Sequence, residues 1–436
     1  MSKSISLGKD SIGKLFLNFS IPAVTGMLVT AFYAIIDGIF IGQGVGADGL
    51  AAINLGYPII NFGAALSLMF GVGGSTLISL YPNNRKIQNR CFSYIIILNI
   101  VSYILILLLV FGFNEKLLYL MGTSEQLLPL VKSYLYPCAI GAGFLMLANS
   151  LNAVVRNDKS PIYAFISMVI GAVTNIILDW LFIMVFKWGM FGGALATAIG
   201  QFFSMLFLIK YFFRFGCHFK YKFINLNLKY LIKILLIGFP SFVMEFAVAL
   251  ITVFFNWAFM KYSGELGVSA FCIVGYIFYI FRMLFSGLGQ GIQPVVSYNY
   301  GAKLKERVHQ TYILGHKVSF VIATIILVWV IFFSKDLILL FNSDPLLREK
   351  ASFGMILYTS SIIFMGANFV NISYYQAKGM TNSANILSIM RSTVFVAISL
   401  YILPKFLGET GIWLALPSSD LLTFLTTLFL QKRKLL

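Results

Sequence analysis

LGYPIINFGAALSLMFGVGGSTLISLY (55–81) can be laid over VGYIFYIFRMLFSGLGQGIQPVVSYNY (274–300) at an offset of 219 residues. Gly, Tyr, Ser and Tyr then coincide within this stretch, and the same offset brings identical residues together in two later stretches. These are Gly56, Tyr57, Ser67, Tyr81, Asn149, Asn152, Gly192, Leu195 and Ala196, which fall on Gly275, Tyr276, Ser286, Tyr300, Asn368, Asn371, Gly411, Leu414 and Ala415. One constant offset, about half of the 436 residues, predicts an internal duplication. A duplicated apolar chain of this length is typical of transporters.

The composition is that of a membrane protein. Hydrophobic residues make up 59% of the chain and charged residues only 11%, whereas about 25% of residues are charged in soluble domains. Apolar stretches of about 20 residues, enough to cross a bilayer, recur throughout. We expect an all-α integral membrane fold of twelve spans: 15–41, 51–80, 92–113, 129–154, 161–186, 190–213, 231–260, 266–298, 312–333, 352–377, 383–403 and 410–430. The first span continues to Asp37 without a cleavage site, so we expect it to be retained.

The spans divide into two lobes. Each half holds six spans, an even number, so both repeats should enter the membrane in the same orientation and be related by an axis along the membrane normal. We therefore expect an N-lobe over 1–213, a basic linker over 214–230 and a C-lobe over 231–436, with a central cleft.

The net charge of +17 could indicate a nucleic-acid partner, but its distribution argues for a membrane topology. With the N-terminus inside, the inner segments hold 22 Lys and Arg residues and the outer segments hold 8. The positive-inside rule then places both termini and the linker in the cytoplasm of a cell membrane protein. We expect membrane lipids as partners, attracted by this charge, and no nucleic acid.

Cysteine and histidine spacing gives no sign of a disulfide or a resident metal. The four cysteines have no paired spacing and are expected to be free thiols, and the histidines at 218, 309 and 316 are expected in inner loops. GVGGS (71–75) and GLGQG (287–291) occupy matching places in the two repeats. Close helix packing is the favoured interpretation of these glycines, and a flexing point is the alternative.

Apart from lysines close to their ends, the predicted spans contain six charged residues, and charge there is costly and usually faces the bundle interior. They are Asp37, Asp179, Glu245, Arg282, Arg391 and Asp420. At a rise of about 1.5 Å per residue, Asp37, Asp179 and Thr197 share one level in the outer half of the N-lobe. Asn175 lies one turn from Asp179 on the same helix face.

This N-lobe set has three interpretations. Its oxygen atoms could bind a cation, or the two carboxylates could bind a proton because nearby acids in low dielectric resist double ionisation. Asp37 and Asp179 could instead simply hydrogen-bond neighbouring helices. In the C-lobe, Glu245 could pair with Arg282 and Arg391 with Asp420, either as structural pairs or as pairs that bias the conformation of the lobe.

Several motifs resemble the MATE family of multidrug and toxic compound extrusion transporters, particularly its MepA/DinF-like branch. The similar segments are YAIIDGIFIG (33–42), LAAINLGYP (50–58), RNDKSP (156–161), TNIILDWLFI (174–183), GMFGGALATAIGQ (189–201), GLGQGIQPVVSYNYGA (287–302) and SYYQAKG (373–379). The resemblance covers essentially the whole chain. It implies two six-helix lobes and export of organic, often cationic and amphipathic drugs in exchange for H+ or Na+, with no other cofactor.

The resemblance also assigns site residues. It places Asp37, Asn175, Asp179 and Thr197 at the N-lobe ion site, with the Gly193 carbonyl beside them. Some relatives carry an acid in span 10, whereas YTSSIIFMGANFVNISYYQ (358–376) has none, and this favours coupling in the N-lobe. A single duplicated chain supplies both lobes, so we expect a monomer.

Two other classes of function stay open. A lipid-linked saccharide flippase of a related superfamily would need cations in its cavity to hold a pyrophosphate, and Arg282 and Arg391 are the candidates. A membrane-embedded enzyme is disfavoured because no Ser/His/Asp or metal-ligand cluster is apparent.

Overall fold

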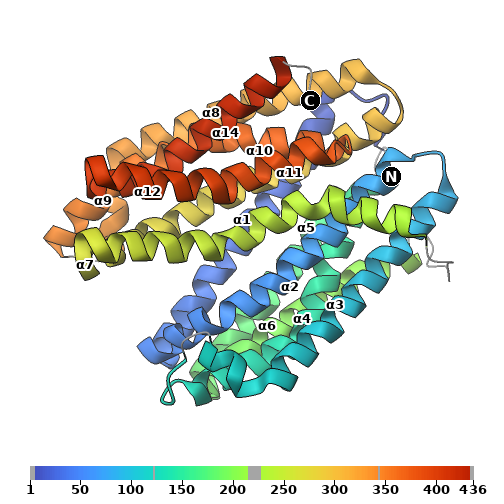
Figure 1. Cartoon of the computed structure of the whole chain (residues 1–436). Coiled ribbons are helices and arrows are strands. Elements are labelled where there is room, and N and C mark those ends of the chain that lie inside the picture. Colours follow the sequence, from blue (N-terminus) through green and yellow to red (C-terminus); the bar gives the residue numbers. More distant parts are fainter. Residues whose placement is uncertain (1–4, 121–122, 215–226, 342–343, 433–436) are drawn as a thin grey trace. The chain divides into compact units, whose positions relative to one another are not determined.

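The computed structural model of the chain, drawn in Figure 1, describes residues 5–120, 123–214, 227–341 and 344–432. Every regular element in these ranges is a helix. Helices are expected of a span in lipid, because all of its backbone hydrogen bonds must be made internally. Most of the predicted linker over 214–230, with Cys217 and His218, lies outside the described residues.

The helices follow the apolar stretches. In the first half they are α1 (Ile12–Gly44), α2 (Ala47–Leu80), α3 (Arg85–Leu120), α4 (Leu128–Asn157), α5 (Pro161–Asp179), the π-helical turn η1 (Trp180–Val185) and α6 (Gly189–Arg214). In the second half they are α7 (Leu228–Gly301), α8 (Lys305–Leu339), α9 (Pro345–Thr359), α10 (Ile362–Ala377), α11 (Thr381–Ile389), the π-helical turn η2 (Met390–Val394), α12 (Phe395–Leu407), α13 (Glu409–Trp413) and α14 (Ala415–Lys432).

The predicted spans and the all-α fold class are confirmed. Among the described residues, ten helical stretches are long and apolar enough to cross a membrane. One of them, α7, has 74 residues and contains two predicted spans that are separated by a break at Gly264, where φ is 61° and ψ is −156°. The last span corresponds to α13 and α14. Span 10 is α9 followed by α10, and span 11 is α11, η2 and α12 in succession.

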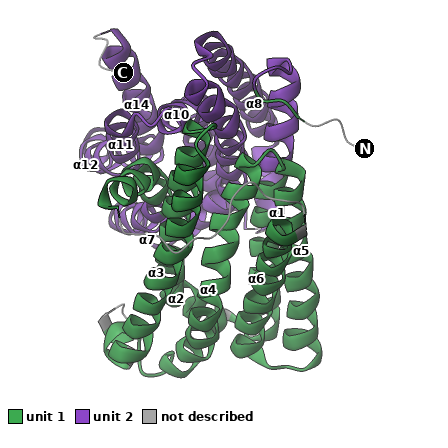
Figure 2. Ribbon diagram, turned by 90° about the vertical axis from the view of Figure 1, so that its right-hand side faces the viewer, with its two compact units in different colours: residues 1–7, 25–245 green, residues 8–24, 246–436 purple. Residues whose placement is uncertain are grey.

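The packing divides the chain into two compact units, coloured separately in Figure 2. Unit 1 comprises residues 1–7 and 25–245, and unit 2 comprises residues 8–24 and 246–436. The divisions therefore fall inside α1 and α7, and not at the linker that separates the predicted lobes. The start of α1 packs with the second repeat, and the start of α7 packs with the first.

Glycines allow the start of each of these helices to pack against the other repeat, an arrangement called the exchange of helix ends below. In unit 1, a side chain on Gly73 of α2 would overlap the backbone of α7 at Ile234, and one on Gly238 of α7 would overlap the α2 backbone. In unit 2, a Cβ on Gly287 or Gly291 of α7 would lie 2.6 Å or 2.5 Å from a Cα atom of α1. The close packing predicted for both glycine-rich segments is thus confirmed, since only hydrogen at these positions lets the backbones meet.

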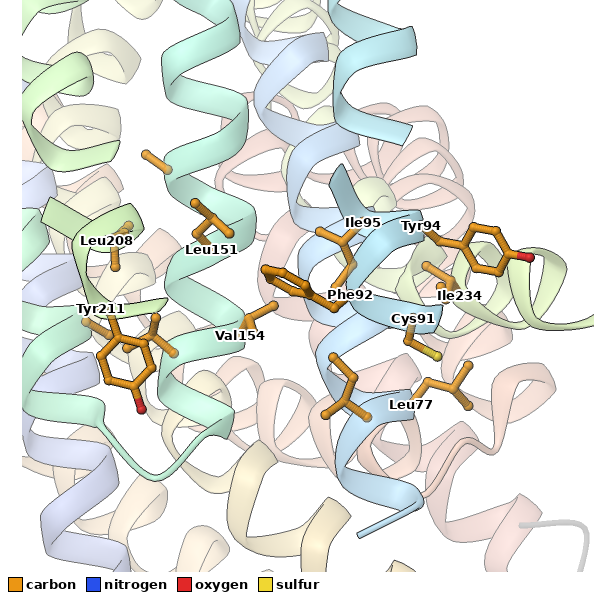
Figure 3. Close-up of a cluster of buried hydrophobic side chains, with 14 of the residues drawn as sticks. Leu77, Cys91, Phe92, Tyr94, Ile95, Leu151, Val154, Leu208, Tyr211 and Ile234 are labelled. Atoms are coloured by element: carbon orange, nitrogen blue, oxygen red, sulfur yellow. The ribbon is translucent and has the colours of Figure 1, made fainter. Parts of the chain in front are cut away.

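The core at one end of unit 1 includes the start of α7. Figure 3 shows Leu77 of α2, Phe92 of α3, Val154 of α4 and Ile234 of α7 in one buried cluster, which also includes Tyr211 of α6. Ile234 is fully buried there. This burial anchors the first turns of α7 to the first repeat.

The thiol prediction holds for the described cysteines, because Cys91, Cys138 and Cys272 are free. The histidine prediction needs a correction. His309 and His316 lie in the first turns of α8 and not in a loop. The helix begins before the predicted span 312–333 and so includes His309. His316 lies inside that span, and its Nε2 contacts Asn371 Oδ1 at 3.0 Å.

Candidate ion-binding site

Two carboxylates from different helices of unit 1 meet in its interior. Asp37 lies in the last third of α1, and Asp179 is the last residue of α5 before the π-helical turn η1. Their side chains are within hydrogen-bonding reach of each other. Asp179 is fully buried and Asp37 is partly buried. π-Helical turns are rare and frequently occur at functional sites.

Close packing of α5 on α6 brings the neutral members of the predicted set together. A Cβ on Gly200 would lie 2.8 Å from the carbonyl oxygen of Gly171, so the two backbones almost touch. One turn away, Asn175 Nδ2 donates a hydrogen bond to Thr197 Oγ1 at 3.2 Å. Asn175, which is 2% exposed, thus stands between Asp179 and Thr197.

Gly193 has a more limited place in the site. It is buried in α6, and a Cβ there would lie 3.1 Å from Ile41 Cδ1 and 3.3 Å from Ile183 Cδ1. Ile41 follows Asp37 by one helical turn, so Gly193 lets α6 approach α1 and η1 beside the carboxylates. A contact of its carbonyl oxygen with a bound ion stays a prediction.

Several oxygen atoms of the site are unpaired within the part of the chain that the structure describes. Among the described residues, both carboxylate oxygens of Asp179, Oδ1 of Asp37 and Oδ1 of Asn175 are buried without a hydrogen-bond partner. A buried acceptor without a partner costs about 1–3 kcal/mol, and more when it is charged. Two carboxylates in contact therefore need a shared proton or a cation.

The donor set distinguishes between kinds of ion. Within the described ranges, no group of three or more His, Cys, Asp or Glu side chains could hold a metal ion. Two carboxylates with one amide and one hydroxyl oxygen instead suit a proton or a hard monovalent cation, because hard cations prefer oxygen ligands.

The sequence interpretation missed two tyrosines and a glutamine at this site. Tyr33, one turn before Asp37, hydrogen-bonds Gln201, which lies one turn after Thr197. Tyr134 of α4 also lies near Asp37. The i,i+4 spacing from Asp37 and from Thr197 could have indicated Tyr33 and Gln201.

The predicted Glu245–Arg282 pair involves residues of different units. Glu245 is the last residue of unit 1, and its backbone oxygen accepts a hydrogen bond from Asn61 Nδ2 at 3.3 Å. Arg282 belongs to unit 2. Their pairing stays a prediction.

Arg391 and Asp420 are in direct contact in unit 2. Arg391 Nε lies 2.6 Å from Asp420 Oδ1, with side chains 9% and 0% exposed. Asn368 Nδ2 donates to the same Oδ1 at 3.1 Å, and the guanidinium lies 4.8 Å from the ring centroid of Phe369. This acid, unlike the N-lobe pair, has a base beside it.

The sequence model of the MatE family matches the chain twice, over residues 22–181 and 240–402. The chain belongs to the MatE family. The two matches start 218 residues apart, which agrees with the offset of the internal duplication. The MatE assignment covers both repeats, including Asp37 and Asp179 in the first and Arg391 in the second.

This MatE chain is similar over most of its length to proteins named as multidrug exporters. It is 27% identical over 415 residues to the multidrug export protein MepA of Staphylococcus saprophyticus, covering 93% of this chain and 90% of that protein. The MepA protein of Staphylococcus aureus is 27% identical over 421 residues, with 95% and 92% covered.

The MatE fold is shared with solved structures. A structure of the outward-facing conformation of a multidrug resistance MATE family transporter of the MOP superfamily has a TM-score of 0.93 and 22% identity. The likeness covers 99% of this chain and 98% of that one. It establishes the twelve-span, two-lobe architecture.

Proposed function

We propose that the chain is a secondary active multidrug exporter. It moves organic compounds, often cationic and amphipathic, outward by alternating access in antiport with H+ or Na+. Its MatE membership and its relatives named as multidrug export proteins support this proposal. We place it in the cell membrane as a monomer, with both termini cytoplasmic.

The observation that carries the proposal is the carboxylate pair of Asp37 and Asp179, which forms no ion pair with a base among the described residues. Its net charge changes when an ion or proton enters, and a change of charge in a low-dielectric interior is worth several kcal/mol. Without the ion, the two carboxylates repel each other and α1 is pushed from α5. With the ion bound, the two helices are held together.

Antiport follows from this difference between the two states of α1. A drug that binds better when the pair is empty is released when the ion enters. By reciprocity, drug and ion must weaken each other's binding by the same factor. A proton would need only the two carboxylates, whereas Na+ would also need oxygen atoms such as Asn175 Oδ1 and Thr197 Oγ1.

Transport by proteoliposomes under an imposed Na+ or H+ gradient tests the proposal. We expect the Asp37→Asn, Asp179→Asn double variant to lose gradient-driven drug export while still binding drug. Asp336→Asn, the same substitution at an exposed position of α8, serves as the matched control and should export at the parental rate. If the double variant still concentrates drug at that rate, coupling lies elsewhere, and Glu245 is the next candidate.

The flippase alternative is weakened by the geometry of the C-lobe. It needs cations that can hold a pyrophosphate, and one of the two candidates, Arg391, already contacts Asp420. Drug tolerance compared with lipid-precursor turnover in expressing cells separates the two functions. Increased precursor turnover without drug tolerance would contradict the exporter proposal.

A further inference from the structure

Tyrosine rings surround a lysine at the end of α10. Lys378 Nζ lies 4.7 Å from the ring centroid of Tyr374, 5.6 Å from that of Tyr300 and 5.9 Å from that of Tyr375. It also donates to the Tyr374 hydroxyl at 3.5 Å. All four residues belong to unit 2. Ring faces attract an ammonium group but cannot neutralise its charge.

Lys378 differs from the lysines that form ion pairs among the described residues. Lys132 pairs with Glu115, and Lys350 pairs with Glu409 at 2.8 Å. In the part of the chain that the structure describes, Lys378 makes no such ion pair. Burial lowers the pKa of Lys378, which measures the cost of holding this charge away from water. A bound anion would offset that cost.

A second layer of hydrogen bonds holds the tyrosines in place. Gln431 of α14 donates to the hydroxyls of Tyr312 at 3.0 Å and Tyr375 at 2.9 Å. Tyr312 in turn donates to Asn371 Oδ1 at 2.7 Å, and its ring centroid lies 4.3 Å from that of Tyr374. Helices α8, α10 and α14 therefore fix the cluster before any ligand arrives.

The cluster is open on one side. Tyr300, at the end of α7, is 39% exposed, while Tyr375 behind it is 2% exposed. Lys303 and Lys305, three and five residues after Tyr300, are exposed and add positive charge to this segment. An anion can therefore reach the ammonium from this side.

We propose that Lys378, Tyr300 and Tyr374 form a binding site for the phosphate group of an anionic phospholipid. The ammonium supplies the charge, the tyrosine hydroxyls can donate hydrogen bonds to phosphate oxygens, and the rings limit competition from water. Lys378 directly follows the apolar stretch Pro345–Ala377, so it lies at the level of lipid headgroups. The proposed topology makes this the inner leaflet, but the binding itself is independent of topology and of the exporter function.

Native mass spectrometry of the purified full chain, titrated with phosphatidylglycerol or phosphatidylcholine, tests this proposal. We expect the parent to prefer phosphatidylglycerol, and Lys378→Gln to weaken that binding about tenfold, or about 1.4 kcal/mol. Lys378→Arg keeps the charge and should retain the preference. Lys233→Gln, which removes the same charge from the start of α7 in unit 1, is the matched control and should bind as the parent does.

Three outcomes would overturn the assignment. Equal losses in Lys378→Gln and Lys233→Gln would show a general electrostatic effect, and equal binding of the two lipids would show no recognition of charge. Inorganic phosphate provides the third arm. If it raises the melting temperature of the parent but not of Lys378→Gln, and no lipid preference is seen, the site takes free phosphate and not a lipid. Melting curves without lipid check that each variant is folded.

Discussion

Removing the charge of Asp420 should destabilise the protein more than removing the charge of its partner, Arg391. Asp420→Asn keeps the shape and the Asn368 hydrogen bond but leaves a buried guanidinium without an acid. Breaking a buried pair in this way costs about 3–5 kcal/mol. The ring of Phe369, 4.8 Å from the guanidinium, recovers only part of this.

Substituting Arg391 instead should cost less free energy of unfolding. Arg391→Gln leaves Asp420 buried, but a carboxylate can become neutral by taking up a proton, whereas a guanidinium cannot lose one. We expect a loss of about 1–3 kcal/mol, the cost of an imperfectly satisfied buried polar group. This loss should shrink as the pH is lowered, and that of Asp420→Asn should not. The double variant, which has no charge, should recover most of the larger loss.

Unfolding of the purified variants in mixed detergent and SDS micelles measures these free energies. Tryptophan emission reports the transition, since Trp413 of the same unit is 1% exposed. The reasoning is refuted if Arg391→Gln costs as much as Asp420→Asn at neutral pH, or if the two losses simply add in the double variant.

Three further predictions concern topology, packing and surface charge. Single cysteines introduced into 214–230 should resist labelling from outside intact cells, because the charge bias places this linker in the cytoplasm; efficient labelling would contradict this. Gly238→Ala should lower the melting temperature, with about 1–3 kcal/mol lost to overpacking against α2, whereas Gly112→Ala, with open space around it, should not. Burial alone would raise the pKa of Glu409, but hydrogen bonds led by that from Lys350 hold this pKa below its ordinary value. The stabilisation that results is at most about 1 kcal/mol. It is present at pH values above the pKa of Glu409 in the unfolded protein, and it disappears as the pH falls through the pKa in the folded protein. Glu409→Gln should therefore make the melting temperature fall less steeply as the pH is lowered into the acid range.

The spans could be predicted because hydropathy reports the length of an apolar stretch directly. The stretch 129–154, for example, became α4 over Leu128–Asn157. Breaks within a span escaped prediction. Span 10 changes helix between Thr359 and Ile362, and span 11 contains η2. A hydropathy pattern reports the polarity of side chains. It carries no information on where the backbone hydrogen bonds depart from the regular α-helical pattern.

The exchange of helix ends could be predicted only in part. The segments 71–75 and 287–291 indicated close packing, but their partners lie far away in sequence, at the starts of α7 and α1. Small residues permit a close approach without specifying what approaches. Similarly, Tyr33 escaped notice because the chain has 22 tyrosines, whereas an aspartate within a span is rare enough to stand out.

The two repeats place charge in corresponding helices but balance it differently. Asp179 directly precedes the π-helical turn η1 in the fifth span of the first repeat, and Arg391 lies within η2 in the fifth span of the second. In the first repeat the neighbour is another acid, Asp37, and in the second it is the opposite charge, Asp420. A pair of like charges needs an ion from outside the protein, and its energy depends on whether that ion is present. A pair of opposite charges is neutral as it stands and needs no ion from outside to balance it. This asymmetry is the physical reason for proposing that ion coupling belongs to the first repeat.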